Sequence, residues 1–300
     1  MKTKSIIIVI VLIISFINCN AQNEKKEADF PELKGLYLGQ KSPGKTSEVF
    51  APGVISRDDY FEHSAAVFSP DLSEVYWAGK PNGARYFEIS FMKEINGKWT
   101  EPEIVFSHQK YSFRNPVFSY DGNKLFFDSR NDIWFVERNG DGWSEAVQVS
   151  SIINIDASET LRSITKNGSI YFSRYNANAS REGRKHEVYV SRKINGNYSK
   201  PKKLGKHVNS DDTRELGLFV APDESYMIIE VSKEDKTSPE FYIIYKQSDG
   251  LWSHRIKLNL GWGLFPSVSP DGKYLFYMSR EGINWVNTSF IEELKPKNLK

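Results

Sequence analysis

The 300-residue sequence contains a single cysteine, Cys19, and only five histidines. One cysteine cannot form an intramolecular disulfide, and the histidines show neither a His-x-His nor a His-Glu-x-x-His pattern. The sequence also lacks a Gly-x-Ser-x-Gly elbow, a phosphate loop and a dinucleotide fingerprint. We therefore predict no catalytic residue, no metal site and no cofactor.

A strong charge bias is also missing. The formal net charge is +2, the pI is about 8.3, and residues of both signs are spread along the chain. Nucleic-acid-binding domains usually carry a clear basic excess, so we predict no nucleic-acid partner. The chain is rich in aromatic residues (14%), and Gly and Asn are frequent at its turns, which favours an all-β protein.

Long hydrophobic runs are absent except near the start of the chain. There Lys2 and Lys4 precede an apolar run over residues 6–17, which is too short for a comfortable membrane span. A basic segment followed by a short apolar segment is typical of a secretion signal, which we place at residues 1–21. The protein is therefore expected to be extracytoplasmic, in the bacterial cell envelope (periplasm or outer membrane) or secreted.

Two cleavage modes remain open for this signal. Cys19 lies directly after the apolar run, where a bacterial lipoprotein carries its lipid, although the preceding Asn18 is not the small residue that this signal prefers. The alternative is ordinary cleavage after Ala21. Membrane association is predicted only through a lipid on Cys19.

One short pattern recurs five times along the chain. A β-rich segment, a turn built on Asp or Asn, and a second β-rich segment occur at 64–77, 114–127, 161–172, 216–229 and 264–277. The turn residues are Asp71, Asp121, Asn167, Asp223 and Asp271. Pro before Asp and Gly after it favour such tight turns, as in Ser269-Pro270-Asp271-Gly272.

Each copy continues with an acidic or amide residue and a third β-rich run, and four copies then show a Gly-containing turn, an aromatic residue and a fourth short strand. Four strands repeated every 40 to 60 residues are typical of β-propeller blades. We predict an all-β fold with five four-stranded blades over residues 47–294. A sixth blade would need strands in the polar N-terminal segment 22–46 and is less favoured. Residues 295–300 form a C-terminal tail.

The fifth repeat lacks its fourth strand, and a matching strand occurs near the start of the mature chain, at residues 47–56. Pairing that N-terminal strand with the C-terminal blade would remove both open sheet edges. We therefore predict that the ring is closed in this way.

The Ser-Pro-Asp-Gly hairpin, the following Asp-Ile-Tyr-like strand (Asp132 onward) and the Gly-x-Trp turn (residues 140–143) resemble the TolB-type, WD-like propeller repeat of bacterial envelope proteins. The resemblance covers residues 47–294 and implies the fold. It implies little about function, because such propellers include binding proteins, lipoproteins and parts of peptidases. Leu72 and Glu224 stand where the family has Gly, and Asn167 replaces the turn Asp.

The repeated turn aspartates have two interpretations. Each blade needs the same hairpin, which favours a structural role. A ring of metal-binding carboxylates is the alternative, but the five turns lie on separate blades and do not converge.

A ligand site is expected where loops gather at the starts of the innermost strands. Arg162 stands out because two other copies have proline at its position, Pro116 and Pro266. Arg130, Arg174 and Arg280 reach the same face, the first two beside Asp132 and Glu187 as local ion pairs. Loop 174–187 could fold over this face. The predicted ligand-binding residues are Glu62, His63, Arg114, Glu159, Arg162, Arg214, Glu215 and Trp262.

The leading hypothesis is a monomeric extracytoplasmic propeller that binds a protein, peptide or glycan partner at this loop-rich mouth. One alternative is a carbohydrate-active enzyme that uses acids such as Glu62, Glu159 or Glu215, which requires two carboxyl groups within about 10 Å. Another is a purely structural envelope protein.

Overall fold

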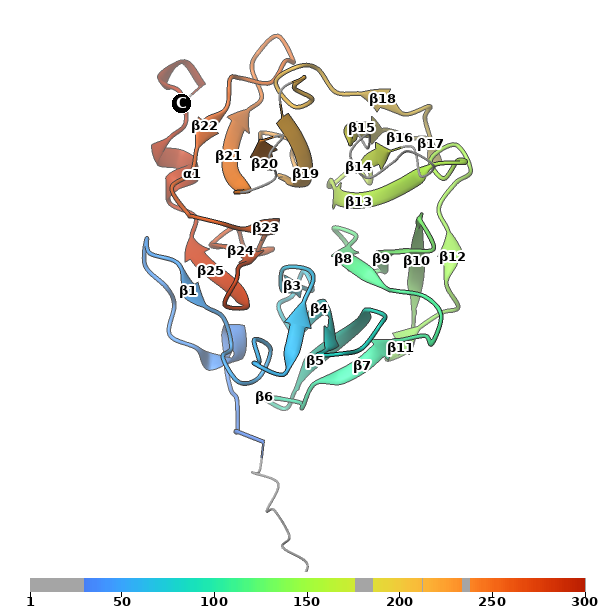
Figure 1. Cartoon of the computed structure of the whole chain (residues 1–300), viewed down its shortest axis with the longest axis vertical. Helices are drawn as coiled ribbons and strands as arrows, with labels where there is room; N and C mark the ends of the chain where they lie inside the picture. Colours follow the sequence, from blue (N-terminus) through green and yellow to red (C-terminus); the bar gives the residue numbers. More distant parts are fainter. Residues whose placement is uncertain (1–29, 176–185, 212, 234–237, 300) are drawn as a thin grey trace, which may run out of the picture. The chain divides into compact units, whose positions relative to one another are not determined.

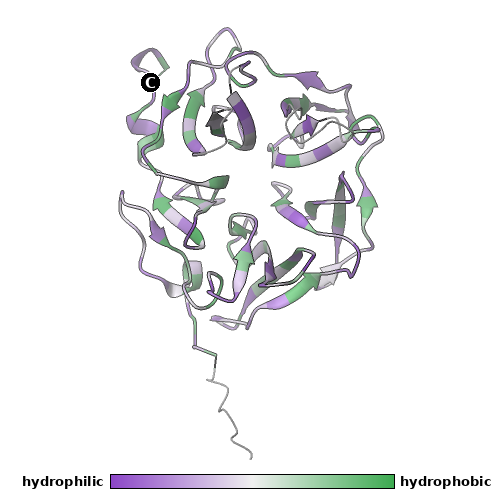
Figure 2. Ribbon diagram, viewed as in Figure 1, coloured by the Kyte–Doolittle hydropathy of each residue, from purple (hydrophilic) through white to green (hydrophobic). Residues whose placement is uncertain are grey.

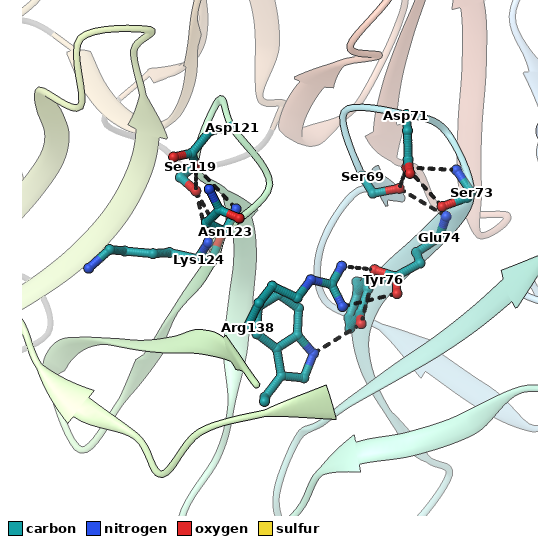
Figure 3. A network of polar contacts seen from close by, with 11 residues as sticks. Ser69, Asp71, Ser73, Glu74, Tyr76, Ser119, Asp121, Asn123, Lys124 and Arg138 are labelled. Atoms are coloured by element: carbon teal, nitrogen blue, oxygen red, sulfur yellow. Dashed lines mark hydrogen bonds and ion pairs between the residues drawn. The ribbon is translucent and has the colours of Figure 1, made fainter. Parts of the chain in front are cut away.

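The predicted turns join the first two strands of each repeat through hydrogen bonds of the turn residue itself. Asp71 Oδ1 accepts hydrogen bonds from Ser69 Oγ at 2.6 Å and from the backbone N of Ser73 at 3.1 Å (Figure 3). Asp121 accepts from Ser119 Oγ at 2.6 Å in the second copy, and this bond lowers the pKa of the Asp121 carboxyl. Asp71 and Asp121 thus bond within their own hairpins, as the structural interpretation requires. Asp271 does so too, and it also accepts a hydrogen bond from the Tyr37 hydroxyl at 2.7 Å.

The computed structural model describes residues 30–175, 186–211, 213–233 and 238–299. The predicted signal segment with Cys19, and residues 176–185 of loop 174–187, lie outside the described residues. Residues Glu32–Lys300 form one unit, which contains the whole propeller. Its sheets form five blades around a common centre (Figure 1), as the repeats predict.

The first two blades follow the same plan, with the innermost strand first in sequence. The first contains β2 (Tyr60–Glu62), β3 (Val67–Phe68), β4 (Glu74–Pro81), β5 (Glu88–Ile95), β6 (Lys98–Trp99) and β7 (Glu103–Phe106). The second contains β8 (Arg114–Phe118), β9 (Lys124–Ser129), β10 (Asp132–Asn139), β11 (Gly142–Trp143) and β12 (Val147–Gln148).

The third blade contains β13 (Ser158–Ile164), β14 (Ile170–Tyr175), β15 (Glu187–Ser191) and β18 (Lys202–Lys203), beside the small hairpin of β16 (Lys193–Ile194) and β17 (Asn197–Tyr198). The fourth contains β19 (Thr213–Val220), β20 (Tyr226–Lys233), β21 (Glu240–Tyr245) and β22 (Ile256–Lys257). All named pairs of strands within the blades are antiparallel, as short hairpin connections require.

The fifth blade is completed by the start of the chain, as predicted. It contains β23 (Leu264–Val268), β24 (Tyr274–Met278) and β25 (Ile283–Asn287), and β1 (Glu48–Val49) pairs with β25. Phe50 follows β1, donates its backbone N–H to the Ile283 carbonyl at 2.7 Å, and buries its ring completely. The ring lies 5.0 Å from that of Phe276 and 5.1 Å from that of Trp285. The closure is therefore both hydrogen-bonded and apolar.

The hydrophobic core lies between neighbouring blades. One buried cluster joins β4 and β5 to β8, β9 and β10, and a second joins the third blade to the fourth. Single strands such as β13 carry both hydrophobic and hydrophilic residues (Figure 2), which matches strands with one face in such a core.

A polar contact supplements the apolar core between the first two blades. Arg138 of β10 forms an ion pair with Glu74 of β4 through two hydrogen bonds (Figure 3). Trp143 Nε1 donates to the Tyr76 hydroxyl at 3.1 Å. These contacts connect residues more than 60 positions apart and fix the two blades side by side.

The described part of the chain contains only short helices: η1 (Leu36–Gly39), α1 (Phe290–Glu293) and η2 (Lys297–Leu299). None of them is long and apolar enough to cross a membrane.

Candidate functional site

The innermost strands share an irregularity close to the centre of the propeller. The pairing register shifts between Arg114 and Val117 in β8, between Leu161 and Ser163 in β13, and at similar points in β19 and β23. A β-bulge re-aims the side chain that it displaces. In β13 the residue at the shift is Arg162.

A cavity of about 320 Å³ lies in the centre, between the five innermost strands. It extends from the bulges to the turns that follow these strands, where the exposed residues Pro70, Tyr120, Pro222 and Pro270 form its rim. The apolar wall residues include Val67, Phe118, Leu161, Leu218, Phe219 and Phe265. Its size falls at the lower end of the range of about 300–1,000 Å³ typical of small-molecule sites.

Arg162 lines this cavity and is half-buried there. Its Nε donates to Ser173 Oγ at 3.0 Å, which fixes the base of the guanidinium. Among the described residues, no carboxylate lies within ion-pair distance of Arg162. Burial lowers the pKa of the Arg162 guanidinium, whereas the nearby charges of Asp128 and Glu230 raise it. The terminal nitrogens thus provide hydrogen-bond donors for a group inside the cavity.

Two buried carboxyl groups lie behind the bulges, on the second strands of their blades. Asp128 of β9 accepts hydrogen bonds from Asn115 Nδ2 at 2.6 Å and from the backbone N of Leu161 at 2.8 Å. Glu230 of β20 accepts from the backbone N of Phe265 at 3.1 Å. Each carboxyl group therefore connects its own blade to the bulge of the next one.

Burial raises the pKa of Asp128 to about 6 and the pKa of Glu230 to about 7. Glu230 Oε1 has no hydrogen-bond partner in the described structure. Gly217 gives this carboxyl group its room, because a Cβ there would lie 2.3 Å from Glu230 Oε2. Both acids interact electrostatically with Arg162, so the buried centre contains charges of both signs.

His63 lies close to this charged centre but is neutral at physiological pH. Burial lowers its pKa to about 4, and the positive charge of Arg114 acts in the same direction. Its ring lies 4.4 Å from that of Phe87 and 4.8 Å from that of Phe265, so it packs as an aromatic residue.

The three predicted acids do not line the cavity but are buried in contacts within the protein. Glu159 forms an ion pair with Arg174 at 2.7 Å, and Glu215 forms one with Arg255 at 2.6 Å. Glu62 accepts a hydrogen bond from the backbone N of Arg57 at 3.2 Å. Burial raises the pKa of all three.

The two Arg–Glu pairs anchor the connections that enter the innermost strands. Arg174 Nη2 also donates to the Ile153 carbonyl at 2.7 Å, and Arg255 Nη2 donates to the Val208 carbonyl at 2.7 Å. Each arginine therefore joins the loop before an innermost strand to the buried glutamate of that strand. The predicted pair between Arg174 and Glu187 does not form. The Arg174 guanidinium pairs with the buried Glu159 instead, and Glu187 pairs with Lys203.

Arg130 also differs from its predicted pairing with Asp132. Its guanidinium lies over the rings of Tyr111 at 4.0 Å and Trp134 at 5.4 Å, and Asp132 accepts a hydrogen bond from Gln148. Arg130 lies in the turn before β10, where its backbone has a positive φ of 55°. From this position its side chain extends over the two rings.

The remaining predicted site residues, Arg114, Arg214 and Trp262, are half-buried and do not line the cavity. Arg114 has a buried Nε without a hydrogen-bond partner in the described structure, and Trp262 lies under Arg280, with 5.5 Å between guanidinium and ring. Of the eight predicted residues, only Arg162 lines the cavity, which reaches the turn end of the innermost strands instead of their starts.

The sequence did not single out Asp128 and Glu230, the two buried acids that interact with Arg162. A visible signal existed for both: each is a lone acid in an apolar second strand, in "KLFFDS" and "YMIIEVS". The described residues contain no group of three or more His, Cys, Asp or Glu side chains that could hold a metal ion.

Comparison with known proteins finds similar solved structures but no family. No family model and no curated protein sequence matches the chain. Among solved structures, it is similar to an oligogalacturonate lyase in complex with manganese (12% identity, TM-score 0.47, 81% of this chain and 68% of that one). It is also similar to a chain of a nidogen–laminin complex (13% identity, TM-score 0.49, 75% of each chain).

A third similar structure is a puromycin-hydrolysing peptidase of Mycobacterium tuberculosis (13% identity, TM-score 0.44, 72% of this chain). The chain spans about a third of that peptidase's length. The five four-stranded blades of the structure confirm the predicted fold. Membership of the TolB-type family stays a prediction.

Proposed function

We propose that this protein is a binding propeller that holds an anionic group of its partner in the central cavity through Arg162. One observation carries the proposal: a half-buried guanidinium lines an apolar cavity and has no carboxylate partner among the described residues. A charge in such surroundings needs a counter-charge or strong hydrogen-bond acceptors. An anion from a partner supplies both, and Arg can hold it with two parallel hydrogen bonds.

Binding is favoured over catalysis by the positions of the acids. Glycoside hydrolysis needs two carboxyl groups that both reach the substrate. Glu159 and Glu215 are held in ion pairs, and Asp128 and Glu230 are buried behind the strands and do not line the cavity. The proposal includes an extracytoplasmic location, because residues 1–21 have the pattern of a secretion signal.

Replacing Arg162 by methionine should weaken binding of an anionic partner while the fold persists. Loss of one charge-assisted contact typically costs about 2 kcal/mol, or about 30-fold in affinity. The measurement is a screen of acidic peptides and acidic glycans against the wild type, followed by calorimetry of the best ligand on Arg162→Met. Circular dichroism should give the same spectrum for both proteins.

Arg130→Met is the matched control, because this arginine is exposed and outside the cavity. Its affinity for the same ligand should equal that of the wild type. A ligand whose affinity is insensitive to Arg162→Met, or a screen in which no anion binds at all, would refute the proposed site.

A further inference from the structure

We infer that the group held by Arg162 is a single carboxylate attached to an apolar body, as at the free C-terminus of a peptide ending in an aliphatic or aromatic residue. This inference rests on the proposed function and names the chemistry of its ligand. Three features of the cavity carry it: its charge, the state of its polar side chains, and its size.

The charges around the cavity favour a ligand with one negative charge over a ligand with several. Arg162 is the only charged side chain among the lining residues. Asp128 and Glu230 lie behind it and reduce the positive field that an anion meets. A phosphate or a cluster of sulfates would bring two or more charges against these acids, and like charges repel. A carboxylate brings one charge, and its planar geometry matches the guanidinium.

Five of the eight uncharged polar side chains of the lining are already hydrogen-bonded within the protein. Asn115 donates to Asp128 at 2.6 Å, and Ser163 Oγ exchanges hydrogen bonds with the backbone of Val220. Ser64 Oγ accepts from the backbone N of Ala78 at 2.7 Å, and Ser119 and Ser269 bond to their turn aspartates. Only the hydroxyl groups of Tyr120, Tyr226 and Ser267 remain among the described lining residues. A glycan needs many more polar partners for its hydroxyl groups than these three.

The apolar walls and the volume set the size of the body attached to the carboxylate. Phe118, Phe219 and Phe265 contribute aromatic surface, and Pro116 and Pro266 contribute rigid apolar surface. A cavity of about 320 Å³ accommodates a small apolar group but no folded segment. With the carboxylate at Arg162, the rest of a peptide would leave past Tyr120 and the rim prolines. A free carboxylic acid of the same chemistry would fit entirely inside.

The test compares ligands that differ by one charge. Calorimetry would use the peptide acetyl-Ala-Ala-Phe-Leu with a free C-terminus, the same peptide as its C-terminal amide, and acetyl-leucine. The free peptide should bind at least about 10-fold more tightly than the amide, and Arg162→Met should abolish this difference. Tighter binding of the tetrapeptide than of acetyl-leucine would identify a peptide terminus as the source, and equal binding would identify a free acid.

The outcomes separate the inference from the proposed function. If a sulfated disaccharide binds through Arg162 and neither carboxylate does, the function stands and the inference is wrong. If acid and amide bind equally well to both proteins, the inference is wrong because no carboxylate is recognised. If no anion binds and Arg162→Met only lowers the melting temperature, Arg162 merely balances the buried acids, and both proposals fall.

The pH dependence gives an independent readout. The charged groups around the site are Arg114, Arg162, Asp128 and Glu230, with His63 neutral above about pH 5. A bound carboxylate disfavours ionisation of the two acids, so binding takes up protons as their pKa values rise. Affinity for the free peptide should therefore fall by at least about threefold between pH 6 and pH 8, whereas a pH-independent affinity would place the ligand away from these acids.

Discussion

Replacing Phe50 by alanine is expected to lower the free energy of unfolding by about 3–5 kcal/mol, the usual cost of removing a fully buried phenylalanine. Phe50 is completely buried at the closure of the ring, against Phe276 and Trp285. The cavity left behind would loosen the contact of β1 with β25. Urea unfolding followed by tryptophan fluorescence measures the change, because Trp285 lies in this cluster.

Phe61→Ala is the control, because the Phe61 side chain is 43% exposed and its removal should cost far less. Deleting residues 45–56 is the stronger form of the same test, since it removes β1 and exposes the edge of β25. We expect the truncated protein to aggregate in size-exclusion chromatography. A truncated protein that remains monomeric with an unchanged melting temperature would contradict the closure.

Replacing Arg255 by methionine is expected to cost about 3 kcal/mol at pH 8, because it leaves Glu215 buried without its partner. Arg255 donates to Glu215 Oε1 at 2.6 Å, to Thr213 Oγ1 at 3.0 Å and to two carbonyl groups of the preceding loop. Only 1% of the Glu215 side chain is exposed, so water cannot replace the lost contacts. Thermal unfolding at two pH values measures the effect.

The sign of the pH effect follows from burial. In the variant, the folded pKa of Glu215 lies above its unfolded value of about 4.3, so the folded state binds more protons. The variant therefore loses stability as the pH rises through this range, and its deficit should be smaller at pH 5 than at pH 8. Lys257→Met, which breaks an exposed ion pair with Glu240, should have little effect at either pH. Equal losses of stability in both variants would show that the ion pair between Arg255 and Glu215 contributes no more than an exposed one.

The fold could be predicted because its determinants are local and repeated. A turn such as Ser269-Pro270-Asp271-Gly272 is specified by residues within four positions of one another, and the hydrogen bonds of Asp271 to Ser269 and Lys273 are all local. The missing fourth strand of the last repeat predicted the closure, because an open sheet edge must be covered. Five blades and the pairing of β1 with β25 are confirmed.

The site could be predicted only in part, because its contacts cross between blades. Arg162 was identifiable from proline at the equivalent positions of two other repeats. Glu215 was placed near the mouth because it begins an innermost strand, but its partner Arg255 lies 40 residues away, directly before β22. No local pattern reveals such a partner. The bulges that turn Arg162 into the cavity depend on the pairing register, which a sequence does not display.

The central claim is that an anion occupies the cavity against Arg162, and a crystal structure of the protein with acetyl-Ala-Ala-Phe-Leu tests it most directly. We expect the terminal carboxylate within hydrogen-bond distance of the Arg162 guanidinium, the leucine side chain against Phe219 and Phe265, and Arg162 Nε still bonded to Ser173. A peptide bound elsewhere, or Arg162 turned onto Asp128 or Glu230 with the ligand carboxylate in solvent, would contradict it.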